Sequence, residues 1–382
     1  MKLLTAGESH GRALAGILEG LPAAVPVSSE ALAAELARRR LGFGRGPRQR
    51  LEEDHFEILS GVRHGLTLGS PIALTIANSE WESEYGELMG VDAGAGRGAA
   101  RLTRPRPGHA DLAGVQKYGF DDVRNVLERA SARETAARVA LGYFCKAFLA
   151  ELGIHVLSHV VRIGRVAAPK RVPGPEDVLA IDRSAVRCLD PDASERMAAE
   201  IRRLRKERDT AGGVAEILVY GAPPGLGSYV HHDRKLDARL AQALMSIQSV
   251  KGVEVGEGFT SAAKPGSKAH DLIFPGPGMP RRGTAKAGGI EGGMSTGQVI
   301  RLRAAFKPLS SLPRAVATVD LDTKEAASAI RQRADVCAVP AGGVIGEAAV
   351  AFVVAEAVLE KFGGDSLPET RRNLDAFVAG LS

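Results

Sequence analysis

The sequence has little cysteine and none of the usual cysteine or histidine patterns of a metal site. Its 382 residues include three cysteines, Cys145, Cys188 and Cys337, whose scattered positions form neither a disulfide framework nor a metal-spaced pair. The Cys-x-x-Cys and His-Glu-x-x-His spacings of zinc sites are absent as well. Such sparse cysteine use is typical of a reducing compartment. We therefore expect a cytoplasmic protein that holds no metal.

Long apolar runs and aromatic residues are also scarce. We expect no run long enough to span a bilayer, and the apolar stretch at the N-terminus is too short for a signal peptide. Aromatic residues make up 4% of the chain, so its arginines are not interleaved with the stacking rings that single-strand binders use. We expect neither a membrane nor a nucleic acid as partner. The alternative left open by a net charge of +5 is an RNA-binding protein whose affinity falls steeply with salt.

The common phosphate and nucleophile motifs are missing or misplaced. No Gly-Lys pair and no Gly-x-Gly-x-x-Gly occurs, which excludes a Walker loop and a dinucleotide fingerprint. Gly-x-Ser-x-Gly occurs at residues 7–11 and 293–297, but a nucleophile elbow needs a preceding strand within an assembled sheet, and residue 9 leaves no room for one. A phosphatase or phosphotransferase is a second alternative. The lack of clustered carboxylates for a divalent metal counts against it.

The chain is instead rich in arginines and histidines set among glycines. They form loops at residues 7–11 (Gly-Glu-Ser-His-Gly), 38–50 (Arg-Arg-Arg-Leu-Gly-Phe-Gly-Arg-Gly-Pro-Arg-Gln-Arg) and 104–111 (Arg-Pro-Arg-Pro-Gly-His-Ala-Asp). Arginine binds phosphate or carboxylate oxygens in pairs, glycine lets the backbone approach a ligand, and histidine titrates near neutral pH. These loops predict acid–base chemistry on a small, multiply anionic substrate.

Three further segments fit this picture. Within a long predicted helix, Arg129 and Arg133 are four residues apart and would share one face with Ser131 between them. The glycine-rich stretch at residues 287–295 allows close backbone approach to a flat ring or a phosphate, and Lys307 follows a predicted strand. Asp335 lies before the last long helix, where it could be an ion-pair partner, a helix cap or a functional carboxylate.

Hydrophobic periodicity predicts both helices and strands. Helices are expected at residues 31–40, 123–152, 195–208, 236–246, 345–362 and 368–381. Strands are expected at residues 14–19, 55–60, 72–76, 155–163, 214–220, 299–306 and 316–321. Because the two do not alternate strictly, a doubly wound parallel sheet is disfavoured. The pattern predicts an α+β fold in a single intertwined domain over residues 1–382.

Read together, the motifs resemble the chorismate synthase family. The resemblance covers essentially the whole chain, and eight motifs appear in order, which is far more specific than any one of them. They lie at residues 5–11, 38–46, 60–65, 106–111, 129–135, 250–256, 287–294 and 337–340.

The resemblance implies a fold, a reaction and partners. The fold of family members resembles a sandwich in which antiparallel sheets flank a helical layer. Members usually assemble as homotetramers. They convert 5-enolpyruvylshikimate 3-phosphate to chorismate by an anti 1,4-elimination of phosphate and a ring proton. The reaction requires reduced FMN although it has no net redox change. Some members reduce this flavin with NADPH, whereas the compact length of this chain favours an external flavin reductase.

The resemblance also implies roles for individual residues. His10 would protonate the departing phosphate, His109 would lie beside the reduced flavin, and Asp335 would help its N5 atom accept the ring proton. The substrate anions would be bound by Arg39, Arg45, Arg48, Arg106, Arg133 and Arg333. FMN would contact Arg129, Ala130, Ser131, Gln248, Ser249, Gly292, Lys307, Pro308, Leu309, Ser310, Ser311 and Arg333. Ala130 stands where the family commonly has serine, which removes one hydroxyl from the expected flavin site.

Overall fold

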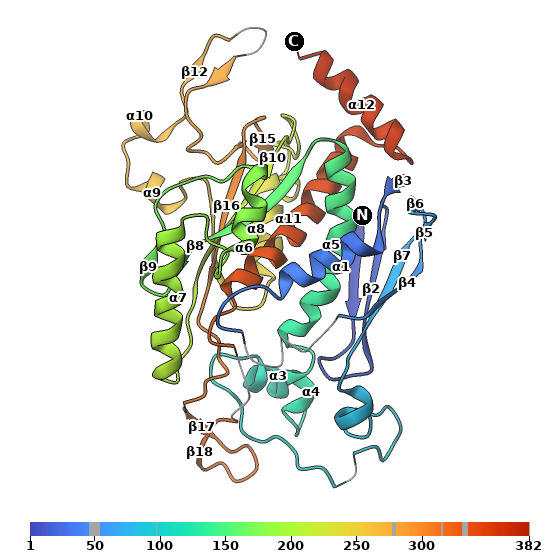
Figure 1. Cartoon of the computed structure of the whole chain (residues 1–382), viewed down its shortest axis with the longest axis vertical. Helices are drawn as coiled ribbons and strands as arrows, with labels where there is room; N and C mark the ends of the chain where they lie inside the picture. The colour runs from blue at the N-terminus through green and yellow to red at the C-terminus, as the bar shows by residue number, and fades with distance from the viewer. Residues whose placement is uncertain (46–53, 97, 277–279, 315, 331–334, 382) are drawn as a thin grey trace.

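Two antiparallel sheets enclose a layer of helices. The computed structural model describes residues 1–45, 54–96, 98–276, 280–314, 316–330 and 335–381. The first sheet has the order β1-β2-β7-β4 and the second the order β11-β16-β10-β8-β9. Figure 1 shows helices α1, α5 and α11 between the two sheets. The α+β sandwich expected from the sequence is therefore confirmed.

The two sheets contain the strands predicted over residues 14–19, 55–60, 72–76, 155–163, 214–220 and 299–306, together with three strands that were not predicted, namely β1, β9 and β11. The first sheet contains β1 (Lys2–Ala6), β2 (Ala13–Glu19), β7 (Ile72–Ala77) and β4 (Phe56–Ser60). The second contains β11 (Val250–Val255), β16 (Ile300–Phe306), β10 (Gly213–Tyr220), β8 (His155–Ile163) and β9 (Val166–Ala167). Alternate residues of β16 are buried, as the period of a strand requires. Short strands complete the set: β3 (Ala23–Pro26), β5 (Val62–Arg63), β6 (Leu66–Leu68), β12 (Ile273–Phe274), β13 (Arg281–Arg282), β14 (Ile290–Glu291), β15 (Met294–Ser295), β17 (Ala317–Val319) and β18 (Ala326–Ser328).

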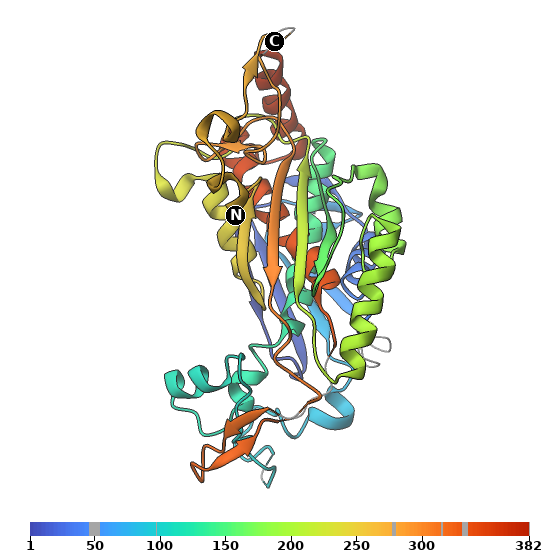
Figure 2. The same cartoon turned by 90° about the vertical axis from the view of Figure 1, so that its left-hand side faces the viewer.

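The helical layer contains α1 (Ser29–Arg39), α5 (Thr135–Glu151) and α11 (Val339–Phe362), and α8 (Leu236–Met245) packs against α11. The side chain of Ser28 caps α1 by accepting a hydrogen bond from the backbone N–H of Ala31. The remaining helices are α3 (Asp111–Tyr118), α4 (Arg124–Leu127), α6 (Val178–Arg183), α7 (Pro191–Lys206), α9 (Phe259–Ala262), α10 (Gly266–Ala269) and α12 (Leu367–Ala379). Figure 2 shows α7 outside the second sheet.

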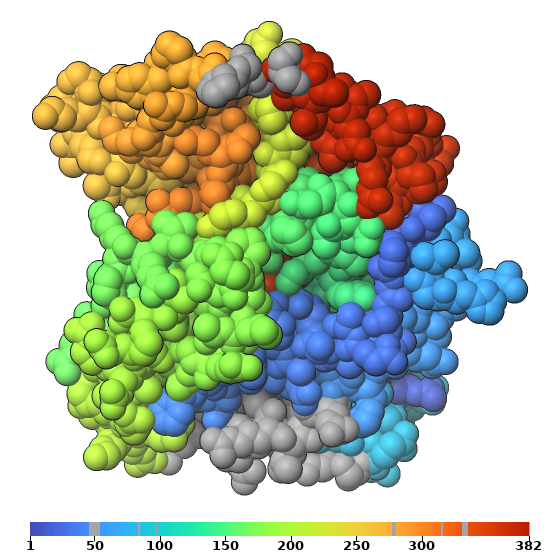
Figure 3. Space-filling view, turned by 45° about the horizontal axis from the view of Figure 1, so that its top comes forward, coloured from blue at the N-terminus to red at the C-terminus, as the bar shows by residue number. Residues whose placement is uncertain are grey.

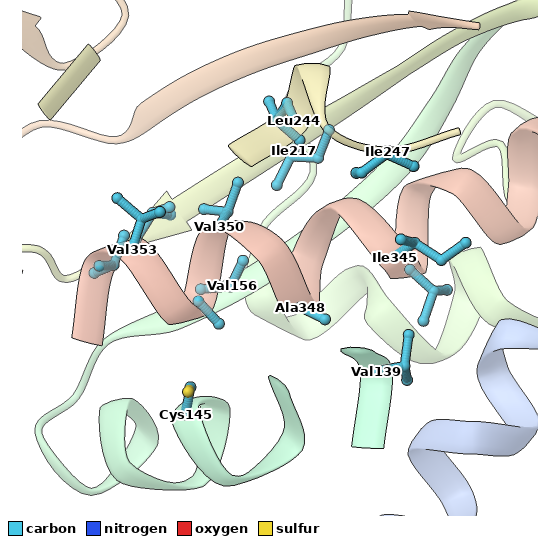
Figure 4. Packing of buried hydrophobic residues seen from close by; sticks show 14 of the residues in the cluster. Val139, Cys145, Val156, Ile217, Leu244, Ile247, Ile345, Ala348, Val350 and Val353 are labelled. Carbon is cyan, nitrogen blue, oxygen red and sulfur yellow. The ribbon is translucent and has the colours of Figure 1, made fainter. Parts of the chain in front are cut away.

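Helix α11 lies at the centre of the core. In Figure 4, Val350 faces Ile217 and Leu244 on one side of the helix, and Ala348 faces α5 on the other. By length and composition alone α11 could cross a membrane, so the expectation that no run is long enough is wrong on that criterion. However, 78% of its apolar window is buried inside the protein, which is typical of a core helix.

The predicted helix over residues 123–152 is interrupted. It divides into α4, a 3-10 turn η2 (Ala132–Glu134) and α5, and the backbone of Ser131 is extended, with φ −68° and ψ 145°. The Ser131 side chain accepts a hydrogen bond from the backbone N–H of Arg133 and so caps η2. Such side-chain to backbone bonds compete with a continuous helix. Arg129 and Arg133 therefore do not share a helix face, and that expectation is wrong.

Candidate active site

The predicted loops meet at one end of the sandwich, the lower end in Figure 1. Antiparallel pairing brings the end of β1 beside the start of β2, and the end of β16 beside the starts of β10 and β11. Helix α1 ends at Arg39, and α5 and α11 both begin at this same end. Two helix N-termini add partial positive charge, which favours bound anions.

His10 is bound to a buried carboxylate. Its Nδ1 atom lies 2.8 Å and 3.0 Å from the two oxygens of Glu128, and its backbone N–H donates to the same carboxylate. The His10 ring stacks on Tyr85 with centroids 4.2 Å apart, and its Nε2 lies 3.9 Å from Glu80. The Glu128 side chain is 2% exposed. Contacts on both the ring edge and the ring face fix the orientation of the imidazole.

The segment after Glu128 holds the loop of His10 in place. Ser131 donates a hydrogen bond to Ser9, and the backbone N–H of Ser9 donates to the carbonyl of Glu128. The guanidinium of Arg129 donates to the carbonyls of Gly7 and Thr5 at 2.9 Å each. The break in the predicted helix thus turns residues 128–131 toward the first loop. Of the predicted cofactor residues here, Arg129 is engaged with protein carbonyls and Ala130 is half-buried.

An arginine cluster lies next to this loop around Asp54. The Asp54 carboxylate contacts NH1 of Arg133 and, at 3.3 Å, NH2 of Arg39, while Nε of Arg40 lies 4.0 Å away. Arg133 also donates through Nε to Asn78 at 3.1 Å. Burial lowers the pKa of Arg39 to about 10, because the attraction of Asp54 offsets this desolvation only in part and Arg133 adds repulsion.

Arg45 forms an ion pair with Asp335. Their NH1 and Oδ2 atoms are 3.1 Å apart, and both side chains are largely buried. Two backbone hydrogen bonds hold the loop before Arg45. The N–H of Phe43 donates to the carbonyl of Ala185, and the carbonyl of Gly44 accepts from the N–H of Val336. Of the alternatives for Asp335, the structure shows an ion pair, with Arg45. The predicted substrate residues Arg48 and Arg333 lie outside the described residues.

His109 belongs to a second histidine–carboxylate pair. Its Nδ1 lies 2.5 Å from Asp111 Oδ1, and Asp111 also accepts from the backbone N–H and the guanidinium of Arg106. Arg106 also donates a hydrogen bond through NH1 to the hydroxyl of Ser311, at 3.0 Å. Burial opposes ionisation of Asp111, but the hydrogen bonds from His109 and Arg106 outweigh it and hold the pKa of this carboxyl below its ordinary value.

Lys307 connects the loop of His109 to residues 248–249. Its backbone N–H donates to the carbonyl of Ser249 at 2.9 Å, and its Nζ donates to the carbonyl of Gly108, next to His109. Burial, followed by repulsion from Lys251, lowers the pKa of Lys307. The adjacent Gln248 donates through Nε2 to Glu134 at 3.3 Å.

The other predicted cofactor residues divide between two places. Residues 308–311 continue from Lys307 at the lower end of Figure 1, where Leu309 accepts a hydrogen bond from Thr210 and Ser311 accepts the one from Arg106. Gly292 lies in the β14–β15 turn, near the opposite end of β16. Since β16 has seven residues, this separation is about 20 Å. Within one chain, the structure does not bring Gly292 to the other predicted cofactor residues.

Figure 3 shows the molecule with the upper end of Figure 1 tilted toward the viewer. The described residues between 260 and 290 and α12 form the two upper corners of this view. Arg371 of α12 bonds to Glu151, the last residue of α5, which places this helix at the far end of the layer. The His10–Glu128 and His109–Asp111 pairs and the Asp54 cluster lie at the opposite end of this layer.

Sequence reasoning missed the carboxylates that hold this site. Glu128 and Asp111 stand within or beside the predicted motifs, and their proximity to Arg129 and His109 is the signal that could have identified them. Asp54 follows two glutamates and resembles an ordinary acidic surface segment, so no local signal identifies it. Its partners Arg39 and Arg133 lie 15 and 79 residues away.

Comparison with known proteins places the chain in a family. The family model for chorismate synthase matches residues 1–359. A chorismate synthase of Leifsonia xyli subsp. xyli is 58% identical, and the match covers 100% of this chain and 96% of that protein. One from Acidothermus cellulolyticus is 59% identical, with 100% and 99% covered. A crystal structure of chorismate synthase is 40% identical and has a TM-score of 0.79, covering 100% of this chain and 98% of the other. The chain therefore belongs to the chorismate synthase family, whose members are lyases.

Proposed function

We propose that this lyase of the shikimate pathway converts 5-enolpyruvylshikimate 3-phosphate to chorismate and phosphate by an anti 1,4-elimination that requires reduced FMN. The observation that carries the proposal is the meeting of two histidine–carboxylate pairs with an arginine cluster at one end of the sandwich. The substrate has one phosphate and two carboxylates, so a site with both permanent cations and titratable imidazoles fits it.

The donor set also fits a flavin with its phosphate. Among the described residues, Oε1 of Gln248 is buried and has no hydrogen-bond partner. Because its Nε2 donates to Glu134, this oxygen is left as an acceptor for an N–H or hydroxyl of the cofactor. Ser131, Ser249 and residues 307–311 supply further donors, and Arg129, Ala130, Gly292 and Arg333 complete the proposed set. Reduced FMN, when bound, supplies transient electron donation during the elimination.

The protein side chains have separate proposed roles in moving protons. As the carbon–oxygen bond breaks, the phosphate leaves with the electron pair, and His10 gives a proton to the oxygen on which charge develops. Glu128 holds His10 in the required orientation. Asp335, held by Arg45, assists removal of the ring proton. His109, held by Asp111, would lie beside the bound flavin.

The arginines bind and orient the substrate anions. Arg39, Arg45, Arg106 and Arg133 are all well buried, which strengthens their attraction for phosphate and carboxylate oxygens. Arg48 and Arg333 belong to the same proposed set. Orientation by several fixed guanidinium groups lowers the entropy cost of reaching the reactive geometry.

We also propose one domain over residues 1–382, a cytoplasmic location and a homotetramer supplied by an external flavin reductase. One hydrophobic cluster includes residues of both sheets and of the helices between them, which supports a single domain. The first sheet exposes Leu4, Ile17 and Leu59, at 66%, 43% and 57%. Apolar side chains on a sheet face favour packing against a second copy of the chain.

The experiment that tests the proposal measures phosphate release and chorismate absorbance under anaerobic conditions. 5-Enolpyruvylshikimate 3-phosphate is supplied with FMN that is either chemically reduced or left oxidised. Turnover only with reduced FMN would support the proposal. Phosphate release without flavin would favour a phosphatase, and no turnover by folded protein in either state would contradict the proposed reaction.

A further inference from the structure

Asp54 is a buried carboxylate inside a cluster of arginines. It lies two residues before β4, and its side chain is 1% exposed. It contacts Arg133 and Arg39 and lies 4.0 Å from Arg40. An acidic residue at the centre of a site built to bind anions opposes the attraction that the arginines exert on a ligand.

The contacts of Asp54 leave different hydrogen-bonding capacity on its two main partners. Arg133 gives NH1 to Asp54, Nε to Asn78 and NH2 to the carbonyl of Ala77, so all three of its nitrogens are engaged by protein. Arg39 gives NH2 to Asp54, whereas its buried Nε has no hydrogen-bond partner among the described residues. A buried N–H without an acceptor is costly, and an oxygen of a bound anion would satisfy it.

The cluster around Asp54 has more positively charged than negatively charged side chains. Asp54 is the carboxylate that contacts Arg39 and Arg133, and Arg40 and Arg45 lie close enough to add positive charge. Without the charge of Asp54, Arg39 and Arg133 would face a phosphate dianion without the one carboxylate that, among the described residues, is seen to contact both. A site with that balance would bind inorganic phosphate tightly and release it slowly.

We infer that Asp54 is a built-in counter-ion that orients Arg39 and Arg133 while limiting the affinity of the cluster for the phosphate product. This inference rests on the proposed function, in which phosphate is released at every turnover. Asp54 is thus a positioning residue that acts through the arginines. Its negative charge weakens the binding of phosphate and so speeds the release of this product.

The test is calorimetric titration of the full-length protein with inorganic phosphate, without flavin or substrate. Asp54→Asn keeps the shape and an oxygen acceptor for Arg133 but removes the negative charge. We expect it to bind phosphate at least about ten-fold more tightly than the unsubstituted protein. The matched control is Asp320→Asn, which makes the same change in charge at the Arg104 pair outside the cluster and should stay within about two-fold.

Two further variants separate the possible outcomes. Asp54→Ser makes the same charge change with a different side chain and should also tighten phosphate binding, so one misfolded variant does not end the test. Arg39→Ala should abolish the binding. If Arg39→Ala leaves phosphate affinity unchanged, the cluster is not the anion site and that part of the proposed function fails. If Arg39→Ala abolishes binding but Asp54→Asn leaves it unchanged or weaker, only the counter-ion role is overturned.

Steady-state kinetics give a second readout. In Asp54→Asn, slow product release should lower kcat and strengthen inhibition by added phosphate, with kcat/KM much less affected. A loss of arginine geometry alone would lower kcat/KM and weaken phosphate inhibition. That result would contradict the inference.

Discussion

Replacing Glu347 with glutamine should remove the carboxylate shared by three cations between the helices and the second sheet. The Glu347 side chain is 0% exposed, and its carboxylate lies 2.7 Å from Arg38, 2.7 Å from Lys146 and 3.1 Å from Arg187. It also accepts a hydrogen bond from Ser158 at 2.7 Å. Since these partners belong to α1, α5, β8 and the chain before α7, the carboxylate joins four parts of the fold.

The expected cost follows from leaving one positive charge of this group uncompensated, since Glu35 and Asp182 still pair with the three cations. Removing one partner of a buried ion pair typically destabilises a protein by about 3–5 kcal/mol. At about 2.1 cal/mol/K per residue, 382 residues give an unfolding entropy of about 0.8 kcal/mol/K. The Glu347→Gln variant should therefore unfold roughly 4–6 °C lower than the unsubstituted protein.

The same carboxylate predicts how the difference depends on pH. Burial opposes the ionisation of Glu347, but Arg38, Lys146 and Arg187 outweigh it and hold the pKa of this carboxyl well below 4.5. A depressed pKa contributes stability that is fully present above the unfolded-state value and is lost as pH falls toward the folded-state value. The stability difference between the two proteins should be constant from pH 7 to about 5.5 and shrink below about 4.5.

The assay is thermal unfolding and urea unfolding at one protein concentration, followed by circular dichroism. Glu207→Gln is the matched control, because it removes the same charge from an exposed pair with Arg203 and should leave the midpoint unchanged. A Glu347→Gln midpoint within 1 °C of the unsubstituted protein, or a difference that grows on acidification, would refute the reasoning.

Three further predictions concern the site and the helical layer. His10→Ala should lower kcat at least about 100-fold while FMN binding, measured by fluorescence quenching, changes little; equal losses would contradict the phosphate-acid role. Glu128→Gln keeps a contact to Nδ1 of His10 but removes its counter-charge, so kcat should fall about ten-fold or more with KM nearly unchanged; a rise in KM alone would count against this. Gly142→Ala would place a Cβ 2.4 Å from that of Ala348 and push α5 from α11, costing about 1–3 kcal/mol in urea unfolding, whereas Gly380→Ala has ordinary contacts and should be neutral.

Local patterns predicted the longest helices and strands because these patterns are periodic, whereas elements such as β1, β11 and α3 were not predicted. The strand expected over residues 155–163 is found at those bounds, and the helix expected over 236–246 is found as Leu236–Met245. Alternation and helical spacing report which side of an element is buried, independently of what covers it. The helix over 123–152 failed for a local reason that periodicity does not contain, namely the cap formed by Ser131.

The site was predictable where a residue type carries its own chemistry. Arginine among glycines indicates an anion, so Arg39, Arg45 and Arg106 could be named from the sequence, and Arg133 from its motif. The structure places Arg39 and Arg133 around Asp54, with Arg45 close enough to repel Arg39. The carboxylates could not be named in this way. An aspartate or glutamate is most often a solvated surface residue, and only its surroundings show whether it is buried beside a cation.

By itself, then, the sequence determined the elements, the anionic character of the ligand and the family motifs. Only the tertiary structure decided which carboxylates hold the functional side chains. His10 and Glu128 are 118 residues apart, and Arg133 and Asp54 are 79 apart. Such pairs form because antiparallel strands and helix ends meet at one end of the sandwich, and burial there makes each charge depend on its partner. Periodicity within a segment carries no information about which other segments will lie beside it.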